Sequence, residues 1–212
     1  METVLLIASE AREFGGLVRH TGEGVPLPWP VDHAREAVHG GRRWIMVANG
    51  PGQALAAKAV STALERSRPD VVVSTGWCGA LDPSIAACAV VDAREHPIVC
   101  ADRVVDSAAA KAELRRTSGA SIVDMESAAV ESAACRAGIP YRCIRVVTDT
   151  AGETFDIDLN AARRPDGRFD HRRILLQVLR RPWTRIPELA RLATRSHQAA
   201  EKLGDFLAGC RV

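Results

Sequence analysis

Short, uninterrupted apolar runs recur along most of the chain up to residue 150 and alternate with stretches of helical hydrophobic spacing. Runs of this kind are typical of strands that are covered on both faces. Their alternation with helices predicts a central mixed, mainly parallel sheet with helices on both sides, a three-layer α/β/α fold. Strands are expected at residues 4–8, 44–48, 71–75, 89–92, 98–105 and 141–148.

The segments between these strands predict helices, a loop and two glycine turns. Helices are expected over residues 54–66 and about 107–116, and the Gly- and Pro-rich residues 20–42 predict a loop with little regular structure. Glycine turns are expected at residues 49–53 and 76–79. The first turn has the geometry to offer backbone N–H groups to an anion, although a tight strand-to-helix connection explains it equally well. It lacks the full signature of a phosphate-binding P-loop or of a dinucleotide site.

Two apolar runs end in carboxylates. Residues 122–130 run from Ile-Val into Asp124, Met125 and Glu126 and then into an alanine-rich helix, and residues 145–151 carry Asp149 directly after another apolar run. Chemistry collects at the carboxyl ends of strands in open α/β sheets, so two such acids indicate a site. The plainer interpretation is that Asp124 caps the helix and Glu126 is a solvated acid of its first turn.

Composition limits the class of protein. A chain of 212 residues is most simply a single domain, residues 1–212, and its formal net charge of +2 does not indicate a nucleic-acid binder. No apolar run approaches the ~20 residues that cross a bilayer, and no signal peptide is recognisable. The six cysteines show no C-x-x-C spacing, so we expect a reducing cytoplasm and no metal site.

The last fifty residues differ from the rest and predict a basic helical C-terminal extension, residues 163–212. Residues 163–195 contain ten arginines and three acids. Pro182 separates one expected helix from a second that has an apolar stripe. Such a stripe usually packs on the sheet while the arginines face water. The alternative is peripheral contact of the basic surface with anionic lipid head groups or a lipid-like substrate.

Four segments of this chain resemble, in order and spacing, the purine nucleoside phosphorylase and nucleosidase superfamily, which includes the methylthioadenosine/S-adenosylhomocysteine nucleosidases. The resemblance spans residues 3–155, and its most specific parts are Met125-Glu126-Ser127 and Thr148-Asp149-x-Ala151. Residues 111–127 and the basic tail look most like the hopanoid-associated phosphorylases, which act on a nucleoside of adenosyl-hopane type. The four segments are residues 50–52, 74–76, 123–128 and 145–151.

This resemblance implies a phosphorylase/hydrolase-like fold and an enzyme that cleaves the N-ribosidic bond of a purine nucleoside of adenosine type. It implies no cofactor, with phosphate as co-substrate if the enzyme is a phosphorylase. It further implies a small-molecule nucleoside as the partner, no nucleic acid, and a homodimer or higher oligomer.

By the same resemblance, Glu126 holds the ribose 2′- and 3′-hydroxyls, because charge-assisted hydrogen bonds can strengthen as the sugar becomes cationic. Met125 packs against the sugar, and Asp149, with Thr148 beside it, protonates purine N7. That role requires a pKa above the ordinary value of about 3.9, or a proton shared with the base.

In nucleosidases a glutamate after the first strand activates the attacking water. Glu13 matches this position best, since an apolar helical face at Phe14 and Leu17 follows it. The register is one residue longer than the usual pattern, so Glu10 remains an alternative. Both acids also suit the plain role of first-turn helix residues.

The nucleophile decides between hydrolysis and phosphorolysis. The acids after the first strand repel phosphate, whereas Arg12, Arg43 and Arg145 are cations that can attract it. The resemblance also puts Gly76, Trp77 and Arg145 at the substrate, but Trp77 stands where relatives often carry a small or hydroxyl residue. These features favour hydrolysis, with phosphorolysis as the alternative.

The segment before Met125 is shorter than in typical nucleosidases, which predicts an open pocket suited to a bulky 5′ substituent such as a hopanoid. A non-catalytic nucleoside-binding protein is a second alternative, although binding alone would not require Asp149. A serine or cysteine hydrolase is disfavoured, since the chain has no G-x-S-x-G elbow and its six histidines form no motif.

Overall fold

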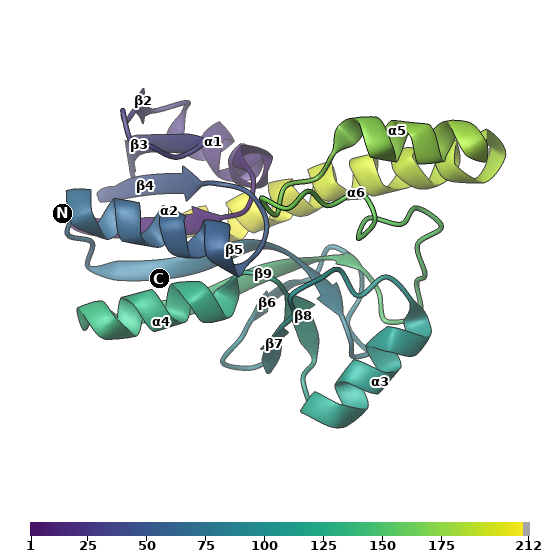
Figure 1. Ribbon diagram of the computed structural model, residues 1–212. Coiled ribbons are helices and arrows are strands. Elements are labelled where there is room, and N and C mark those ends of the chain that lie inside the picture. The colour runs from purple at the N-terminus through teal and green to yellow at the C-terminus, as the bar shows by residue number, and fades with distance from the viewer. Residues whose placement is uncertain (210–212) are drawn as a thin grey trace.

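A mixed sheet of nine strands forms the centre of the part of the protein that the computed structural model describes, residues 1–209 (Figure 1). Cys210 and the last two residues of the predicted basic extension lie outside these described residues. The sheet order is β2 (Val25–Pro26), β3 (His33–His39), β4 (Arg42–Ala48), β1 (Glu2–Ala8), β5 (Val71–Ala80), β8 (Ile122–Asp124) and β7 (Ile98–Cys100); β9 (Tyr141–Asp149) pairs with β5 and with β6 (Val90–Asp92).

The central strands β4, β1, β5 and β9 run parallel. Most of their residues are buried because helices cover both faces, which explains why the strands read as uninterrupted apolar runs. The registers pair Ala8 with Ala48 and Ile7 with Ser74. The carboxyl ends of these strands therefore meet at one edge of the sheet, as the sequence predicts for a doubly covered sheet.

Helices form a layer on each side of the sheet and confirm the three-layer α/β/α prediction (Figure 1). On one side, α2 (Gln53–Arg66) packs against β1 and β4, and α4 (Ser127–Ala137) packs against β5 and β9. On the other side lie η1 (Ala11–Phe14), α1 (Gly15–Thr21) and the second half of α6 (Pro182–Gly209). The remaining helices, α3 (Ala108–Ser118) and α5 (His171–Arg180), lie near the carboxyl-end edge.

Two glycines fix the second half of α6 on the body of the protein. A Cβ on Gly204 would lie 2.0 Å from the carbonyl carbon of Gly16, and a Cβ on Gly16 would lie 2.2 Å from the carbonyl oxygen of Ala200. Only glycine allows the two backbones to come this close. The first half of α6 and α5 extend beyond the sheet as a hairpin (Figure 1).

The loop expected at residues 20–42 is wrong in part, because it contains β3. This strand pairs antiparallel with β4 through the turn at Gly40 and Gly41. Within it Ala34 and Ala37 are buried while the neighbouring side chains are half-buried or exposed. A strand of this kind has no uninterrupted apolar run, so the pattern that reveals the central strands is missing.

The second expected glycine turn, residues 76–79, is also wrong, because β5 continues through it to Ala80. Along this stretch β5 pairs with β9, and the register shifts between Cys78 and Gly79. The glycines of β5 serve close contacts with side chains rather than a turn, as the site shows.

The C-terminal helices agree with the break expected at Pro182. Helix α5 ends at Arg180, and Pro182 is the first residue of α6, where a proline fits without loss of a helical hydrogen bond. Helix α6 then continues through Pro187. None of the helices within residues 1–209 is long and apolar enough to cross a membrane.

Candidate active site

The first acid of the 122–130 segment, Asp124, serves the structure of the site. It is buried at the end of β8, and its carboxylate accepts hydrogen bonds from the Ser127 backbone N–H at 2.8 Å and the Ser127 hydroxyl at 2.7 Å. It also pairs with the guanidinium of Arg145. Asp124 therefore caps α4 and fixes where the next acid lies.

The second acid, Glu126, is buried rather than solvated and lines a cavity at the carboxyl-end edge. One carboxylate oxygen accepts the Gly52 N–H at 2.8 Å and the other accepts the Met125 N–H at 3.3 Å. The glycine turn before α2 thus donates to a protein carboxylate. Burial raises the pKa of Glu126, and the nearby charge of Arg145 opposes that rise.

Asp149 ends β9 and lines the same cavity. Its Oδ1 accepts the Thr148 hydroxyl at 3.0 Å, and its Oδ2 lies 2.5 Å from the ammonium of Lys111. Burial raises the pKa of Asp149, whereas the charge and hydrogen bond of Lys111 lower it. The positive charge of Lys111 thus affects the pKa of Asp149, the acid expected to donate a proton.

Lys111 is a site residue that the sequence analysis did not identify. Its side chain is fully buried, and its ammonium also donates to the Thr150 carbonyl at 2.9 Å and the Glu153 carbonyl at 3.3 Å. The one signal in the sequence is a lysine three residues before Leu114 in an alanine-rich helix, which puts it on the inner face of α3.

Glu13 lies in η1, the short helix that follows β1, behind the cavity, and is 2% exposed. Its carboxylate accepts hydrogen bonds from the Ser9 hydroxyl, from the Glu10 N–H at 2.8 Å and from the Trp77 N–H at 3.0 Å. Burial raises its pKa to about 7, with a further rise from Glu126. Glu10 instead lines the cavity, part-exposed, and pairs with Arg12 at 2.5 Å.

Gly76 makes room for Glu13. A Cβ at Gly76 would lie 1.7 Å from Glu13 Oε2, and the residue has a φ of +123°, which side-chain-bearing residues rarely adopt. The next residue, Trp77, lines the cavity, with the guanidinium of Arg12 stacked 4.6 Å from the centre of its ring. Its buried indole N–H has no hydrogen-bond partner in the described protein.

The three arginines considered for phosphate differ in their positions. Arg145 is buried behind the acids and does not line the cavity; it donates to the Thr75 carbonyl at 2.6 Å and pairs with Asp124. Arg43 pairs with Glu36 and lies near the start of β4, at the opposite edge of the sheet. Of these three, Arg12 alone lines the cavity.

The cavity has a volume of about 530 Å³ and two chemically different ends. The residues that line the polar end include Glu10, Trp77, Met125, Glu126, Thr148 and Asp149. The other end is apolar and is formed by the segment after β9 and by the two C-terminal helices. Its apolar lining residues are Phe155, Ile157, Leu159, Phe169, Ile174, Leu175, Leu189, Leu192 and Ala193.

A comparison with protein families matches residues 89–180 to the phosphorylase superfamily. This range contains Lys111, Met125, Glu126 and Asp149. No curated protein matches the sequence.

Solved structures share the fold over nearly the whole chain. The native futalosine hydrolase of Helicobacter pylori superposes with a TM-score of 0.72 at 13% identity, covering 97% of this chain and 95% of that one. The 5′-methylthioadenosine/S-adenosylhomocysteine nucleosidase of Neisseria meningitidis, in complex with methylthio-immucillin-A, gives 0.66 at 19%, covering 97% and 100%. A mutant nucleosidase of H. pylori with 5′-methylthioadenosine in its active site gives 0.69 at 14%, covering 97% of each chain. At these identities the likeness establishes the fold.

Proposed function

We propose that this chain, whose residues 89–180 match the phosphorylase superfamily, is an enzyme that hydrolyses the N-ribosidic bond of a purine nucleoside of adenosine type. The observation that carries the proposal is the arrangement of three buried carboxylates: Glu126 and Asp149 line the polar end of one cavity, and Glu13 lies just behind it, hydrogen-bonded to the lining residues Ser9 and Trp77. Burial raises the pKa of Glu13 and of Asp149, as acid–base catalysis near neutral pH requires. The nucleosidases among the structures of the same fold support this proposal.

Glu126 is the proposed sugar-binding group. Breaking the bond between ribose and base leaves positive charge on the sugar, and a carboxylate that accepts the two ribose hydroxyls stabilises this charge more in the transition state than in the substrate. The N–H groups of Gly52 and Met125 hold the carboxylate in place beforehand. Met125 lines the cavity beside it and supplies an apolar contact for the sugar ring.

Asp149 is the proposed proton donor. As the glycosidic bond breaks, its electron pair stays with the base, and the carboxyl proton of Asp149 moves to N7 of that base. The hydroxyl of Thr148, which donates to Asp149 Oδ1, fixes the orientation of the acid. The leaving group is then a neutral purine.

Glu13 is the proposed base for water. Its carboxylate takes a proton from a water molecule while the water oxygen forms the new bond to the anomeric carbon, so the products are the free base and the free sugar. A pKa of about 7 makes Glu13 a stronger base than an ordinary carboxylate while leaving it ionised above neutral pH. Glu10, at the same strand end, is the alternative base.

Hydrolysis is favoured over phosphorolysis by the charges at this end of the cavity. Arg12 is already paired with Glu10, and Arg145 is paired with Asp124 and donates to the Thr75 carbonyl and the Ser74 hydroxyl. A phosphate dianion would therefore meet the carboxylates of Glu10 and Glu13 without an uncommitted arginine from this set. Phosphorolysis remains the alternative reaction.

The apolar end of the cavity supports a nucleoside with a large apolar 5′ substituent, of which a hopanoid is one candidate. The groups that recognise sugar and base occupy the polar end, and side chains such as Phe155, Leu159 and Leu192 form the other end. An ordinary nucleoside has no apolar group of a size to cover these side chains.

The test is release of free base from adenosine, methylthioadenosine and a nucleoside with a long alkyl 5′ substituent, each with and without phosphate. Release without phosphate, fastest for the alkyl nucleoside, is the expected result. Release that depends on phosphate would make the protein a phosphorylase. Preference for unsubstituted adenosine would remove the proposed 5′ specificity and leave the bond cleavage standing.

A nucleoside-binding protein without activity is the competing class, and Asp149→Asn separates it from an enzyme. An enzyme loses turnover by about a hundredfold or more while nucleoside affinity changes little. Asp205→Asn, on the exposed face of α6, is the matched control and should behave as the native protein. Native protein that binds a nucleoside and releases no base under any of these conditions would be a binding protein.

By resemblance we further propose a cytoplasmic homodimer or higher oligomer. Peripheral contact with a membrane through the basic tail is a separate proposal, which concerns the α5–α6 hairpin.

A further inference from the structure

Large apolar side chains are concentrated on the exposed surface of one part of the molecule, the hairpin formed by α5 and the first half of α6. A single exposed apolar residue is ordinary, but a contiguous group marks a surface that is used for binding. The exposed members of this group are Leu175, Leu176, Leu179, Trp183, Ile186 and Leu189.

Helix α5 has two different faces. Its inner face is used: Val178 is buried, and the amide of Gln177 exchanges hydrogen bonds with the backbone of Asp158 at 2.8 and 2.9 Å. Its outer face presents Leu175, Leu176 and Leu179 to solvent. The outer face is therefore an apolar surface left over after the helix has packed on the protein.

Two arginines lie on this same outer face. Arg172 and Arg180 are four residues before and four residues after Leu176, a spacing that puts all three on one side of a helix. Neither arginine has an acidic partner among residues 1–209. Leucines flanked by unpaired arginines on an exposed helix are the pattern of helices that lie in the interface of an anionic bilayer.

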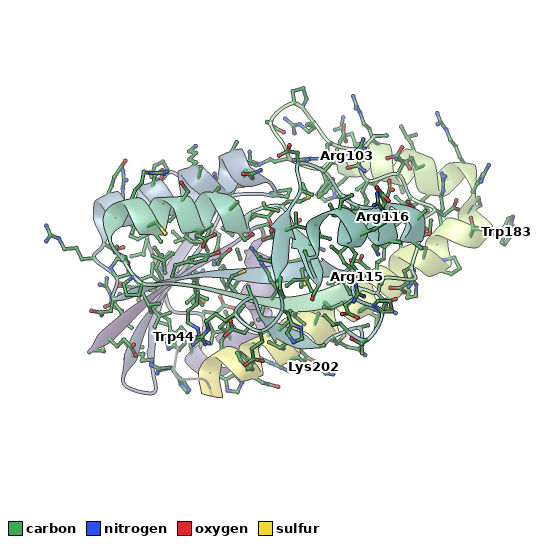
Figure 2. The ribbon with its side chains drawn as sticks, turned by 90° about the horizontal axis from the view of Figure 1, so that it is seen from below. Trp44, Arg103, Arg115, Arg116, Trp183 and Lys202 are labelled. Carbon is green, nitrogen blue, oxygen red and sulfur yellow. The ribbon has the colours of Figure 1, made fainter. Side chains whose placement is uncertain are left out.

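Trp183 extends this surface at the turn between the two helices. It is 91% exposed, and Figure 2 shows it at the far end of the hairpin, pointing away from the protein. An indole ring is most stable at the level of lipid head groups, with its apolar body in the acyl region and its N–H in water.

The charge of the segment matches a lipid partner. Residues 163–195 carry ten arginines and three acids in a chain whose formal net charge is only +2. Acids such as Asp32, Glu153 and Asp156 pair with several of these arginines, so the charge on the hairpin that remains without an acidic partner among residues 1–209 is that of Arg172 and Arg180. Each such arginine near an anionic membrane contributes to binding. An apolar protein partner would not require this charge.

We infer that the α5–α6 hairpin docks on the surface of an anionic phospholipid bilayer, with Leu176, Leu179 and Trp183 in the interface and the arginines at the phosphates. The close packing of Gly204 on Gly16 holds the base of the hairpin against the body while the tip is free to enter the interface. Leu175 and Leu189 are exposed and also line the apolar end of the cavity, so the cavity opens beside the docked surface.

The test is co-sedimentation of the purified full chain with vesicles, without any nucleoside, so that its outcome does not depend on the proposed hydrolysis. Phosphatidylcholine vesicles with and without phosphatidylglycerol are compared at low and high salt. We expect binding to the anionic vesicles only, weakened by salt. Absence of binding to anionic vesicles would overturn the inference.

Variants locate the surface. The double variant Leu176→Glu/Trp183→Glu should bind anionic vesicles at least about tenfold more weakly than the native protein. Because Leu176 and Trp183 do not line the cavity, this variant should release base from a soluble nucleoside as the native protein does. Arg172→Gln/Arg180→Gln should lose about tenfold and much of the salt dependence. The matched control Val25→Glu/Val38→Glu changes two other exposed apolar residues, on β2 and β3, and should bind normally.

Equal binding of the Leu176/Trp183 variant and the native protein would show that the hairpin is not the docking surface. Light scattering on the same proteins tests the other occupant of an apolar surface, a second copy of this chain. If the native protein were an oligomer and the Leu176/Trp183 variant a monomer with unchanged vesicle binding, the hairpin would instead be an interface between copies of this chain.

Discussion

The ammonium of Lys111 lies 2.5 Å from the carboxylate of Asp149, and both side chains are buried. Two effects on the acid therefore compete. Burial favours a neutral carboxyl group that can donate a proton, whereas a cation at this distance favours the carboxylate. The three acceptors around the ammonium, Asp149 and the carbonyls of Thr150 and Glu153, satisfy its three N–H groups and hold the cation in place.

Replacement of Lys111 by methionine should raise the pKa of Asp149, because the opposing charge is lost and burial remains. The limb of the pH–rate profile that Asp149 sets should move to higher pH by about one unit or more. The measurement is kcat/KM for base release between pH 4 and pH 10. This range extends about three pH units on either side of neutrality, so it contains both limbs of the pH–rate profile.

Lys58→Met is the matched control, since Lys58 is an exposed lysine on α2. Its profile should coincide with that of the native protein. A Lys111→Met variant that folds and is active with an unshifted profile would mean that Lys111 does not set the proton affinity of Asp149. A variant with the nucleoside affinity of the native protein and no turnover at any pH would likewise count against this role, and would favour Lys111 as part of the proton path.

Glu13→Gln should abolish the limb near pH 7 and lower kcat by about a hundredfold or more, because the proposed base can no longer take a proton from water. The same change should stabilise the protein at high pH. In the native protein the folded-state pKa of about 7 lies above the unfolded value, so stability is lost as pH rises from about 4.5 to 7. A glutamine has no proton to lose in this range.

Thermal unfolding at pH 8 measures this second effect, and an unchanged or raised midpoint is expected for Glu13→Gln. Glu10→Gln is the comparison that decides which acid is the base, since Glu10 is part-exposed and paired with Arg12. If Glu10→Gln, rather than Glu13→Gln, removed the activity, the roles of the two residues would have to be exchanged.

The acids of the site could be predicted because their signal is local. Both acids follow apolar runs. Asp149 ends β9, which is parallel to β5, so its place at the carboxyl-end edge follows from the sheet. Glu126 follows β8, which is antiparallel to β5, so its place at the same cavity also depends on how β8 packs beyond the end of β5. Lys111 could not be predicted, because a lysine in a helix is usually solvated and its contact with Asp149 depends on how α3 packs. The sequence likewise predicts that Arg145 belongs to the site, but it does not predict that Arg145 is buried behind Asp124.

The fold, like the site, could be predicted where its signal in the sequence is local. Central strands such as β1 and β4 are buried on both faces and stand out as apolar runs, whereas β3 is half-buried and does not. The sequence predicts a turn at Gly76 because glycine most often marks one. Its conformation within β5 instead serves a contact with Glu13, which no local pattern encodes.

Gly76→Ala should be strongly destabilising and should inactivate the protein. The new Cβ would fall 1.7 Å from Glu13 Oε2 on a backbone with a φ of +123°, so both the strand and the carboxylate would have to move. Strain of this kind costs about 1–3 kcal/mol before the loss of the Glu13 hydrogen bonds is added. Urea unfolding and base release measure the two effects, and Gly209→Ala, whose Cβ would meet nothing within 4 Å, is the control. Native activity in Gly76→Ala would contradict the position of Glu13 behind the cavity.

Arg145→Gln tests whether this arginine stabilises the fold or binds phosphate. Arg145 and Asp124 are a buried pair, so removal of the cation leaves an uncompensated carboxylate, at a cost of about 3–5 kcal/mol. Arg43→Gln breaks a part-exposed pair with Glu36 and should cost about 1 kcal/mol or less.

If Arg145 only supports Asp124, the double variant Asp124→Asn/Arg145→Gln should recover part of the stability, and neither protein should show a phosphate-dependent rate. A phosphate-dependent rate in the native protein that disappears in Arg145→Gln, without a large loss of stability, would instead make Arg145 a phosphate ligand and the enzyme a phosphorylase.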